Sequence, residues 1–268
     1  MPGTALHVAR RPRAFVAVTG PESASFLERM LSNEVESLEL GGSAEALLLT
    51  PKARVIATIV VWRRGADDFL LLTEPDAGER LRAELARARF AAKVAIELEE
   101  HESTLVVGRE APPGAIPNLD YGLPAYEVVD EQVPEWAAVG EDELERLRIR
   151  AGTPRLGREL DDRVLPAEAG LDRRAISFTK GCYPGQEPVA RLHYRGHPNR
   201  QLRVLAVDGE ELPPYDAELA LAGKVVGRVT SAAHDPEHGI VALAYVRREV
   251  ADDAELELAD RTVRRLTV

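Results

Sequence analysis

The stretch Lys180-Gly181-Cys182-Tyr183-Pro184-Gly185-Gln186-Glu187 is the most informative part of the chain. Cys182 is the only cysteine in 268 residues, and two glycines and a proline surround it. Glycine allows backbone conformations that other residues avoid and lets a ligand approach closely. Lys180 would favour the thiolate form of the nearby thiol. Two interpretations stay open: a reactive cysteine on a tight bend, or a small apolar side chain that fills a turn.

The composition is typical of a globular protein with one large domain or two to three small ones. Hydrophobic residues make up 45% of the chain and charged residues 29%. The longest apolar run, Val55 to Trp62, predicts a buried strand because it is too short to cross a bilayer. Arg10, Arg11 and Arg13 interrupt any apolar leader, so no secretory signal is expected. A single cysteine excludes an internal disulfide and predicts a cytoplasmic location.

The formal net charge of −11 opposes strong binding to nucleic acid, which requires many cationic side chains facing phosphates. Arginines nevertheless gather after the cysteine motif, at Arg191, Arg195, Arg200 and Arg203. A basic pocket in an acidic protein suits a small anionic ligand better than a polyanion. The alternative is that these arginines are solvated strand and loop edges.

Helix and strand patterns alternate along the chain without long parallel β–α–β repeats, which predicts an α+β fold. Asp76 and Glu79 have the spacing of a capping box at the start of the second predicted helix. Strands are expected at 15–18, 46–49, 54–63, 69–73, 93–98 and 103–107, and helices at 21–31, 76–90 and 141–151.

The rest of the chain is richer in turn signals. Residues 111–124 contain four prolines and two glycines and predict a long crossing loop. Residues 153–179 are expected to be irregular and to wrap a pocket. From Gln201 onward, short strand patterns separated by turns predict a small β-barrel. These patterns lie at 202–207, 225–230 and 240–246.

The cysteine octapeptide, with Val189-Ala190-Arg191 and the spacing Gly196-x-x-x-Arg200, resembles the signature of the YgfZ branch of the folate-binding GcvT-like proteins. The resemblance covers about the whole chain. It implies a GcvT-like (aminomethyltransferase) fold in which two interleaved α/β lobes, within residues 1–196 and crossing near 111–124, surround a central pocket. Residues 197–268 would form a C-terminal β-barrel domain. Supporting segments are 31–35, 48–55, 147–154, 166–171, 229–231 and 242–244.

The resemblance also implies a function, since a mitochondrial relative is an iron–sulfur assembly factor. We expect a folate-binding protein that assists iron–sulfur cluster assembly or repair, with indirect effects on tRNA modification. The cofactor would be tetrahydrofolate or a one-carbon derivative. The partners would be iron–sulfur assembly or client proteins, with no strong direct nucleic-acid binding and no membrane. Two alternatives stay open: a tetrahydrofolate-dependent aminomethyl- or methyltransferase, and a folate-binding module without catalysis.

Site residues follow from the same resemblance. The family's glutamate in the Pro-x-Glu segment contacts the pterin, and here it is Glu168; a carboxylate can pair with two adjacent N–H donors of a pteridine. Without the resemblance, Glu168 would be taken for a surface loop acid. Asn33 could either bind a pterin edge or cap a turn. Cys182 and Lys180 are the expected catalytic residues. The other expected ligand contacts are Tyr183, Gln186, Glu187, Arg191 and Arg195.

Thr58 departs from the aminomethyltransferase pattern, in which an aspartate acts near the folate. Threonine cannot hold a negative charge against a developing cation, so glycine-cleavage chemistry is not expected. No metal site is predicted: His193 and His197 follow Cys182, but Gly196 and Pro198 argue against a regular helix across that spacing. A Cys–His hydrolase would also need an orienting third group. One cysteine cannot hold a four-thiolate cluster, so a cluster would lie elsewhere, be transient or be shared between chains.

Overall fold

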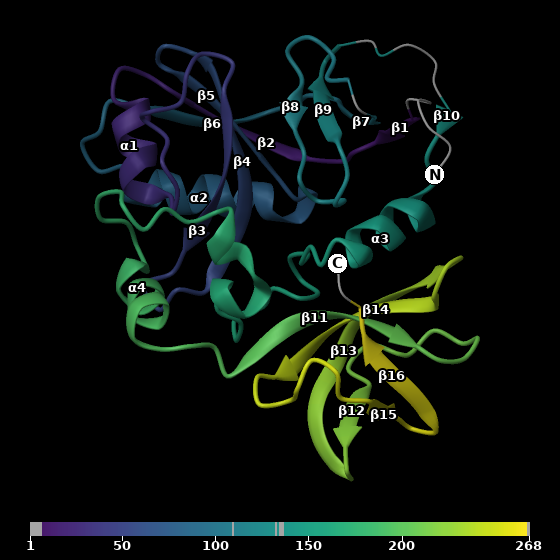
Figure 1. Cartoon of the computed structure of the whole chain (residues 1–268). Helices are drawn as coiled ribbons and strands as arrows, with labels where there is room; N and C mark the ends of the chain where they lie inside the picture. Colours follow the sequence, from purple (N-terminus) through teal and green to yellow (C-terminus); the bar gives the residue numbers. More distant parts are fainter. Residues whose placement is uncertain (1–6, 109, 132, 134–136, 267–268) are drawn as a thin grey trace.

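The computed structural model describes residues 7–266, except 109, 132 and 134–136 (Figure 1). Within these residues, two five-stranded sheets and a closed six-stranded barrel form the framework. The predicted α+β class is confirmed. No described helix is long and apolar enough to span a membrane.

The first lobe is an antiparallel sheet in the order β3-β4-β5-β2-β6, with helices on one face. Alternate strand residues pack against Phe26, Leu27, Leu81 and Leu85 of the helices, as the period of two in a half-buried strand predicts. The other face turns toward the second sheet. The elements are β2 (Ala14–Thr19), α1 (Ser23–Met30), β3 (Ser43–Leu49), β4 (Val55–Gly65), β5 (Asp68–Thr73), α2 (Gly78–Ala88) and β6 (Ala95–Glu99).

The start of α2 differs from the prediction. A short 3-10 turn, η1 (Pro75–Ala77), comes first, and no side chain caps α2. Glu79 bonds Arg82 on the helix surface instead of closing a capping box with Asp76, so that prediction is wrong. Gly78 is the first residue of α2. A side chain at this position would overlap Ala14 of β2, so close packing against β2 requires glycine where the helix begins.

The second lobe is a sheet in the order β10-β1-β7-β9-β8. Its strand β1 precedes β2 of the first lobe, so the two lobes are interleaved along the chain. Leu147 of α3 packs beneath this sheet, and Ile149 packs against the barrel. The elements are β1 (His7–Arg10), β7 (Ser103–Val107), β8 (Ile116–Pro117), β9 (Ala125–Val129), β10 (Ala137–Ala138) and α3 (Glu141–Arg150).

The C-terminal part closes into a barrel in the order β11-β14-β13-β12-β15-β16 (Figure 1). Side chains from all six strands fill its interior, as expected for a small barrel. The predicted barrel is therefore confirmed, although three of its short strands, β12, β15 and β16, were not predicted. The strands are β11 (Arg200–Val207), β12 (Glu218–Leu221), β13 (Lys224–Asp235), β14 (Gly239–Arg247), β15 (Leu256–Leu258) and β16 (Arg261–Arg265).

Residues 153–179 connect the lobes to the cysteine loop and are largely irregular, as predicted. They contain the 3-10 turns η2 (Pro166–Ala169) and η3 (Leu171–Arg173), and helix α4 (Gln186–Arg195) follows the cysteine loop. Their apolar side chains form one core cluster with Leu47 and Leu49 of β3. This packing holds the irregular segment against the inner face of the first sheet.

Candidate functional site

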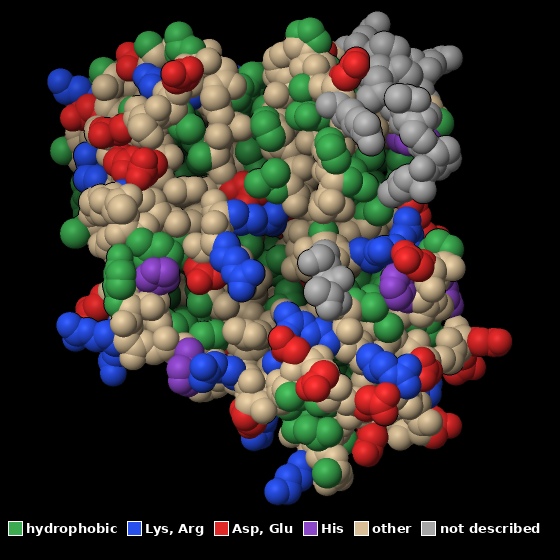
Figure 2. Space-filling view, viewed as in Figure 1, with side chains coloured by type: hydrophobic (Ala, Val, Ile, Leu, Met, Phe, Trp, Pro, Cys, Tyr) green, Lys and Arg blue, Asp and Glu red, His purple; other side chains and the backbone are tan. Residues whose placement is uncertain are grey.

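A narrow cavity lies over the inner face of β3 and β4, between the two lobes. The cavity volume is about 60 Å³. Figure 2 shows this face of the molecule hollowed near its centre, with cationic side chains close to the hollow. Residues 153–156 and 171–175 contribute to the wall, so the irregular segment wraps a pocket as predicted. The charged or polar lining residues are Arg11, Arg13, Glu45, Thr58, Glu74, Asp120, Tyr121, Arg148, Thr153, Arg155 and Arg174.

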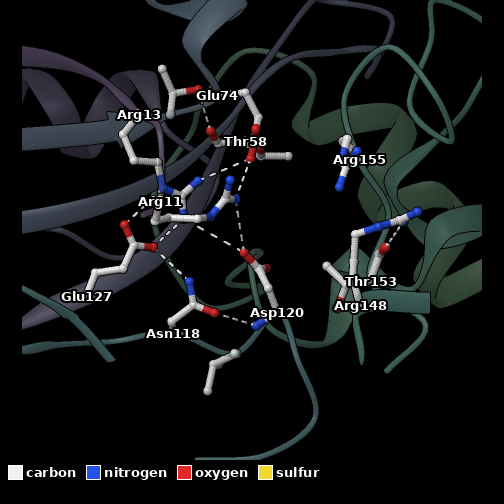
Figure 3. Close-up of polar contacts among 12 residues, drawn as sticks. Arg11, Arg13, Thr58, Glu74, Asn118, Asp120, Glu127, Arg148, Thr153 and Arg155 are labelled. Carbon is white, nitrogen blue, oxygen red and sulfur yellow. Dashed lines mark hydrogen bonds and ion pairs between the residues drawn. The ribbon is translucent and has the colours of Figure 1, made fainter. Parts of the chain in front are cut away.

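A buried ion pair joins Arg13, which lines the cavity, to Glu127, which does not (Figure 3). Glu127 on β9 accepts hydrogen bonds from Arg13 Nε at 3.0 Å and Nη2 at 2.5 Å. Ser103 and Asn118 also donate to Glu127. Burial alone would raise the pKa of Glu127, but the Arg13 guanidinium lowers it to about 2. Burial likewise opposes the charge on Arg13, yet Glu127 raises the pKa of Arg13 well above its usual value.

Alternating charges continue from this pair across the cavity. Arg11 Nη2 donates to Glu74 at 2.7 Å and lies 3.6 Å from Asp120. Asp120 accepts from Arg174 at 3.2 Å, and Arg174 Nε lies 2.9 Å from a carboxylate oxygen of Glu45. The chain of charges thus links the segment between β1 and β2 to strand β3.

Two more arginines form the wall nearest α3 (Figure 3). Arg148 donates to Glu145 at 2.6 and 2.9 Å and to the Thr153 carbonyl at 2.6 Å. Its side chain is buried, whereas Arg155 is 45% exposed and pairs with Glu145 at 2.5 Å. Arg155 is therefore the more accessible of the two to an anionic group that enters the cavity.

Thr58 lines the cavity from β4, directly opposite Leu47 of β3. Its backbone carbonyl accepts a hydrogen bond from the Thr73 hydroxyl at 2.7 Å. The position that the resemblance singles out therefore faces the cavity and presents a hydroxyl where the aminomethyltransferase pattern has a carboxylate.

The predicted catalytic pair is separated by the way its loop folds. Cys182 is a free, exposed cysteine in the loop before α4. The Lys180 side chain is 1% exposed, and its Nζ donates to the carbonyls of Leu31 at 2.9 Å and Asn33 at 2.5 Å. Glu28 lies 3.2 Å from the same Nζ. Burial lowers the pKa of Lys180, and these contacts show that Lys180 anchors the loop to the end of α1.

Tyr183 is buried in the core cluster beside β3, and its hydroxyl lacks a hydrogen-bond partner among the described residues. Burial raises the pKa of Tyr183 to about 12. Gln186 begins α4 and makes a long contact, 3.5 Å, with the Gly181 carbonyl. Glu187, Arg191 and Arg195 are exposed on α4.

Glu168 and Asn33 occupy different places. Glu168 accepts from the Leu165 N–H at 3.1 Å and pairs with Arg200 at 3.3 Å, in a groove beside the barrel. Asn33 donates to the backbone carbonyls of Glu45 at 2.8 Å and Arg174 at 3.2 Å, so it supports the cavity wall from behind. Neither they nor the other predicted site residues line the central cavity. The roles predicted for these residues stay predictions. Glu168 lies in a groove that is separate from the central cavity.

Thr58 was singled out from the sequence, but the charged residues of the cavity wall were missed because their partners are distant in sequence. In the sequence, Arg11 and Arg13 served only as evidence against a secretory signal. In the fold they bind Glu74 and Glu127, which lie 61 to 114 positions away along the chain. Charge patterning over one helix or strand carries no information about such pairs. One local signal was available: the arginines precede a buried strand, where a charge requires a partner.

One cluster of metal-ligand types exists among the described residues, formed by Asp235, Glu237 and His238. Asp235 already pairs with Arg146 at 2.9 Å and Arg150 at 3.3 Å. His193, considered for zinc at the sequence level, stacks on Phe178 with ring centroids 3.7 Å apart. Asp235 and His193 are thus each engaged by neighbouring side chains.

Comparisons with known proteins agree with this architecture. Residues 200–267 match the glycine cleavage T-protein C-terminal barrel domain. The tRNA-modifying protein YgfZ of Edwardsiella ictaluri is 26% identical, covering 94% of this chain and 88% of that protein. An aminomethyltransferase of Streptomyces coelicolor is 24% identical, covering 90% and 80%. The glycine cleavage system aminomethyltransferase T of Bartonella henselae superposes with a TM-score of 0.85, at 20% identity, over 97% of this chain and 84% of that one.

The fold is therefore the GcvT-like (aminomethyltransferase) fold, with two α/β lobes around a central pocket and a C-terminal barrel, as predicted. The similarity to the YgfZ/GcvT-like family, predicted from the cysteine motif, is confirmed.

Proposed function

We propose that this protein binds a folate in its central cavity and assists iron–sulfur cluster assembly or repair, with indirect effects on tRNA modification. The observation that carries the folate part is the cavity wall, where carboxylates and guanidinium groups face one hollow. A folate has a complementary part for each, because its ring edge donates N–H groups and its tail carries carboxylates. The names of the YgfZ and aminomethyltransferase relatives support the same class.

The residues present fit tetrahydrofolate or a one-carbon derivative. The cavity volume is about 60 Å³, below the usual size of small-molecule pockets, so a whole folate would need the wall side chains to move apart. Arg155 would hold a tail carboxylate, since guanidinium and carboxylate match in shape and charge. The acids of the opposite wall would take the ring's N–H donors. A bound tetrahydrofolate would supply a carrier for a one-carbon unit, while the protein supplies orientation and charge.

The cluster part of the proposal rests on Cys182. An exposed thiol on an anchored loop can reach iron held by another protein, whereas a buried thiol cannot. One cysteine provides one ligand, so a client or partner chain would provide the remaining ligands. In this proposal the iron–sulfur cluster is cargo that binds here transiently and is not a resident cofactor.

A tetrahydrofolate-dependent aminomethyl- or methyltransferase is the second candidate, favoured by the fold it shares with an aminomethyltransferase. Thr58 weighs against it, because no carboxylate occupies that position in the cavity wall. That candidate predicts turnover of a one-carbon folate with an amine acceptor. A non-catalytic folate-binding module predicts saturable binding and no effect on cluster-dependent enzymes.

Calorimetric titration with tetrahydrofolate tests the folate part. We expect saturable binding to the wild-type protein and about tenfold weaker binding to Arg155→Ala, which loses one charge-assisted contact. Glu79→Ala, which removes an exposed acid on α2, serves as the matched control and should bind like the wild type. Loss of binding in Glu168→Ala alone would move the ligand to the groove beside the barrel. No binding to the wild-type protein would end the folate proposal.

Complementation of a deletion strain tests the cluster part. We expect the wild-type gene to restore the activity of an iron–sulfur enzyme that modifies tRNA, and Cys182→Ser to fail. The exposed position of Cys182 predicts that the variant unfolds at the same temperature as the wild type, which separates chemistry from folding. Full restoration by Cys182→Ser would make a role for the thiol untenable.

A further inference from the structure

One exposed face of helix α4 carries two arginines beside a tyrosine. Arg191, Tyr194 and Arg195 stand three and four positions apart, so they share one side of the helix. All three are exposed, and the exposed fraction of Tyr194 is 66%. Among the described residues, neither arginine has an ion-pair partner, whereas Lys180 before the helix and Arg200 after it do. Figure 1 shows α4 at the outer edge of the molecule.

The tyrosine on this face is held in place by two neighbouring rings. Phe178 and His193 stack with their ring centroids 3.7 Å apart. Tyr194 meets both rings edge to face, with its centroid 6.2 Å from Phe178 and 4.8 Å from His193. An exposed aromatic ring that is already fixed loses little rotamer freedom when a partner covers it. Tyrosine and arginine are also enriched among the residues that dominate the energy of protein interfaces.

The helix is fixed to the fold and begins beside the thiol. Val189 on its inner side is buried in the core cluster that includes β3. Gly185, the residue before α4, lies so close to the turn between β3 and β4 that no side chain fits there. Cys182 is exposed in the loop that leads into the helix. With ten residues, α4 is about 15 Å long, so one interface of about 800 Å² on each partner can cover both this face and Cys182.

The charge of this face indicates what it would bind. The net charge of the chain is −11, which disfavours the approach of acidic proteins over most of its surface. The two arginines reverse that sign locally, while Glu187, one turn earlier on α4, keeps the face mixed. Nucleic acid presents negative charge throughout, whereas a protein surface can offer acids to the arginines and another group to Glu187. An acidic protein surface therefore fits this face best.

We propose that the α4 face formed by Arg191, Tyr194 and Arg195 docks an acidic surface of the protein that meets Cys182. The proposal rests on the proposed function, since that partner would be the iron–sulfur assembly or client protein. The two guanidinium groups bind carboxylates of the partner, and Tyr194 packs against an apolar side chain between them. Docking holds the partner's reactive group at the thiol and disfavours partners with a basic surface.

Thiol–disulfide exchange with two activated peptides tests the proposal. One peptide carries aspartates on both sides of a cysteine, the other carries lysines, and each cysteine is joined in a disulfide to thionitrobenzoate. The Cys182 thiolate attacks the peptide sulfur, a disulfide forms between the two, and the coloured thionitrobenzoate leaves as a thiolate. Cys182 is the only cysteine of the chain, so the colour reports this site alone.

The wild-type protein should react about 5- to 10-fold faster with the acidic peptide at low salt. At about 1 M salt the two rates should become similar, because screening limits charge interactions to about 3 Å. A leucine added to the acidic peptide should raise its rate about threefold, the effect of burying roughly one methylene group. Tyr194→Ala should remove that gain.

Two double variants assign the preference to the arginines. Arg191→Ala/Arg195→Ala should lose the preference for the acidic peptide. Lys93→Ala/Lys224→Ala removes two exposed cations from other parts of the fold, so it has the same net charge and should keep the preference. Reaction with neutral iodoacetamide corrects for any change in the thiol itself, and thermal unfolding checks that each variant is folded.

The outcomes separate this docking face from the proposed function. Equal rates of the two peptides with the wild-type protein, or an unchanged preference in Arg191→Ala/Arg195→Ala, would overturn the docking face. If added tRNA blocks the reaction and the arginine variant abolishes that block, the face binds nucleic acid and the proposal is overturned. If Cys182→Ser complements the deletion strain while the peptide preference depends on the arginines, the docking face stands and the cluster proposal fails.

Discussion

Glu127→Ala is expected to lower the free energy of unfolding by about 3–5 kcal/mol. The Glu127 side chain is 2% exposed and Arg13 is 5% exposed. Removing the carboxylate leaves a guanidinium group inside the protein without its principal partner, and a buried charge of that kind is strongly destabilising. Chemical denaturation of the wild type and the variant would measure the difference as a shift in the transition midpoint at unchanged slope.

Two comparisons sharpen this result. Glu79→Ala removes an exposed partner of Arg82 and should change stability little. The double variant Arg13→Met/Glu127→Leu removes both charges and should be less destabilised than Glu127→Ala alone. If Glu127→Ala unfolded at the same denaturant concentration as Glu79→Ala, the ion pair would contribute nothing measurable.

The Arg13–Glu127 ion pair also predicts how the free energy of unfolding falls at low pH. The pKa of Glu127 is lowered from 4.5 to about 2 in the folded protein. Because the folded value is the lower one, the stabilisation is complete above pH 4.5 and is lost as the pH falls from there toward 2. A shift of this size corresponds to about 3 kcal/mol. Glu127→Gln should therefore show a flatter loss of stability over that range.

The Arg13–Glu127 pair bears on the proposed ligand site because it joins the two lobes. Arg13 lies just before β2 of the first lobe, and Glu127 lies on β9 of the second. Glu74 and Asp120 extend the contact toward Arg11 and the cavity. A network that bridges the interleaved lobes keeps the walls of the cavity at a fixed separation. Loss of Glu127 should therefore weaken ligand binding as well as folding.

Much of the fold follows from short-range patterns in the sequence. The apolar run at 55–62 lies within β4, and the acids and arginines of α3 mark its two ends. Turn signals after Gln201 predict the barrel. These predictions succeed because a period of 2 or 3.6 reflects burial on one face of one element. The short strands β8, β10 and β15 offer too few residues for such a pattern.

The cavity wall could not be predicted in the same way. Glu45 is an ordinary acid within a strand pattern, and only the register of β3 on β4 places it beside Thr58. Lys180 was expected to act on Cys182, because the two are close in sequence. In the fold, the ammonium group turns to carbonyls of residues 31 and 33. Contacts between residues so far apart depend on the tertiary structure, and no local pattern records them.

Gly185→Ala is expected to destabilise the protein by about 3–5 kcal/mol or to prevent folding. Gly185 has φ +83°, in the left-handed region that favours glycine. An added Cβ would lie 2.6 Å from the Thr50 carbonyl oxygen and 3.1 Å from Leu49 Cβ. The carbonyl cannot easily retreat, because it accepts the Ala53 N–H at 2.8 Å in the turn between β3 and β4. Thermal unfolding and the soluble yield of the variant would measure the effect.

Gly181→Ala provides the matched control from the same motif. No atom lies within 4 Å of the Cβ that it would add, and its φ is not in the left-handed region. We expect its stability to stay within about 0.5 kcal/mol of the wild type. Equal stability of the two variants would contradict the packing of the loop on β3. If Gly181→Ala were stable and yet failed in complementation, the space beside Cys182 would be needed by a partner of the thiol, since the fold does not need it.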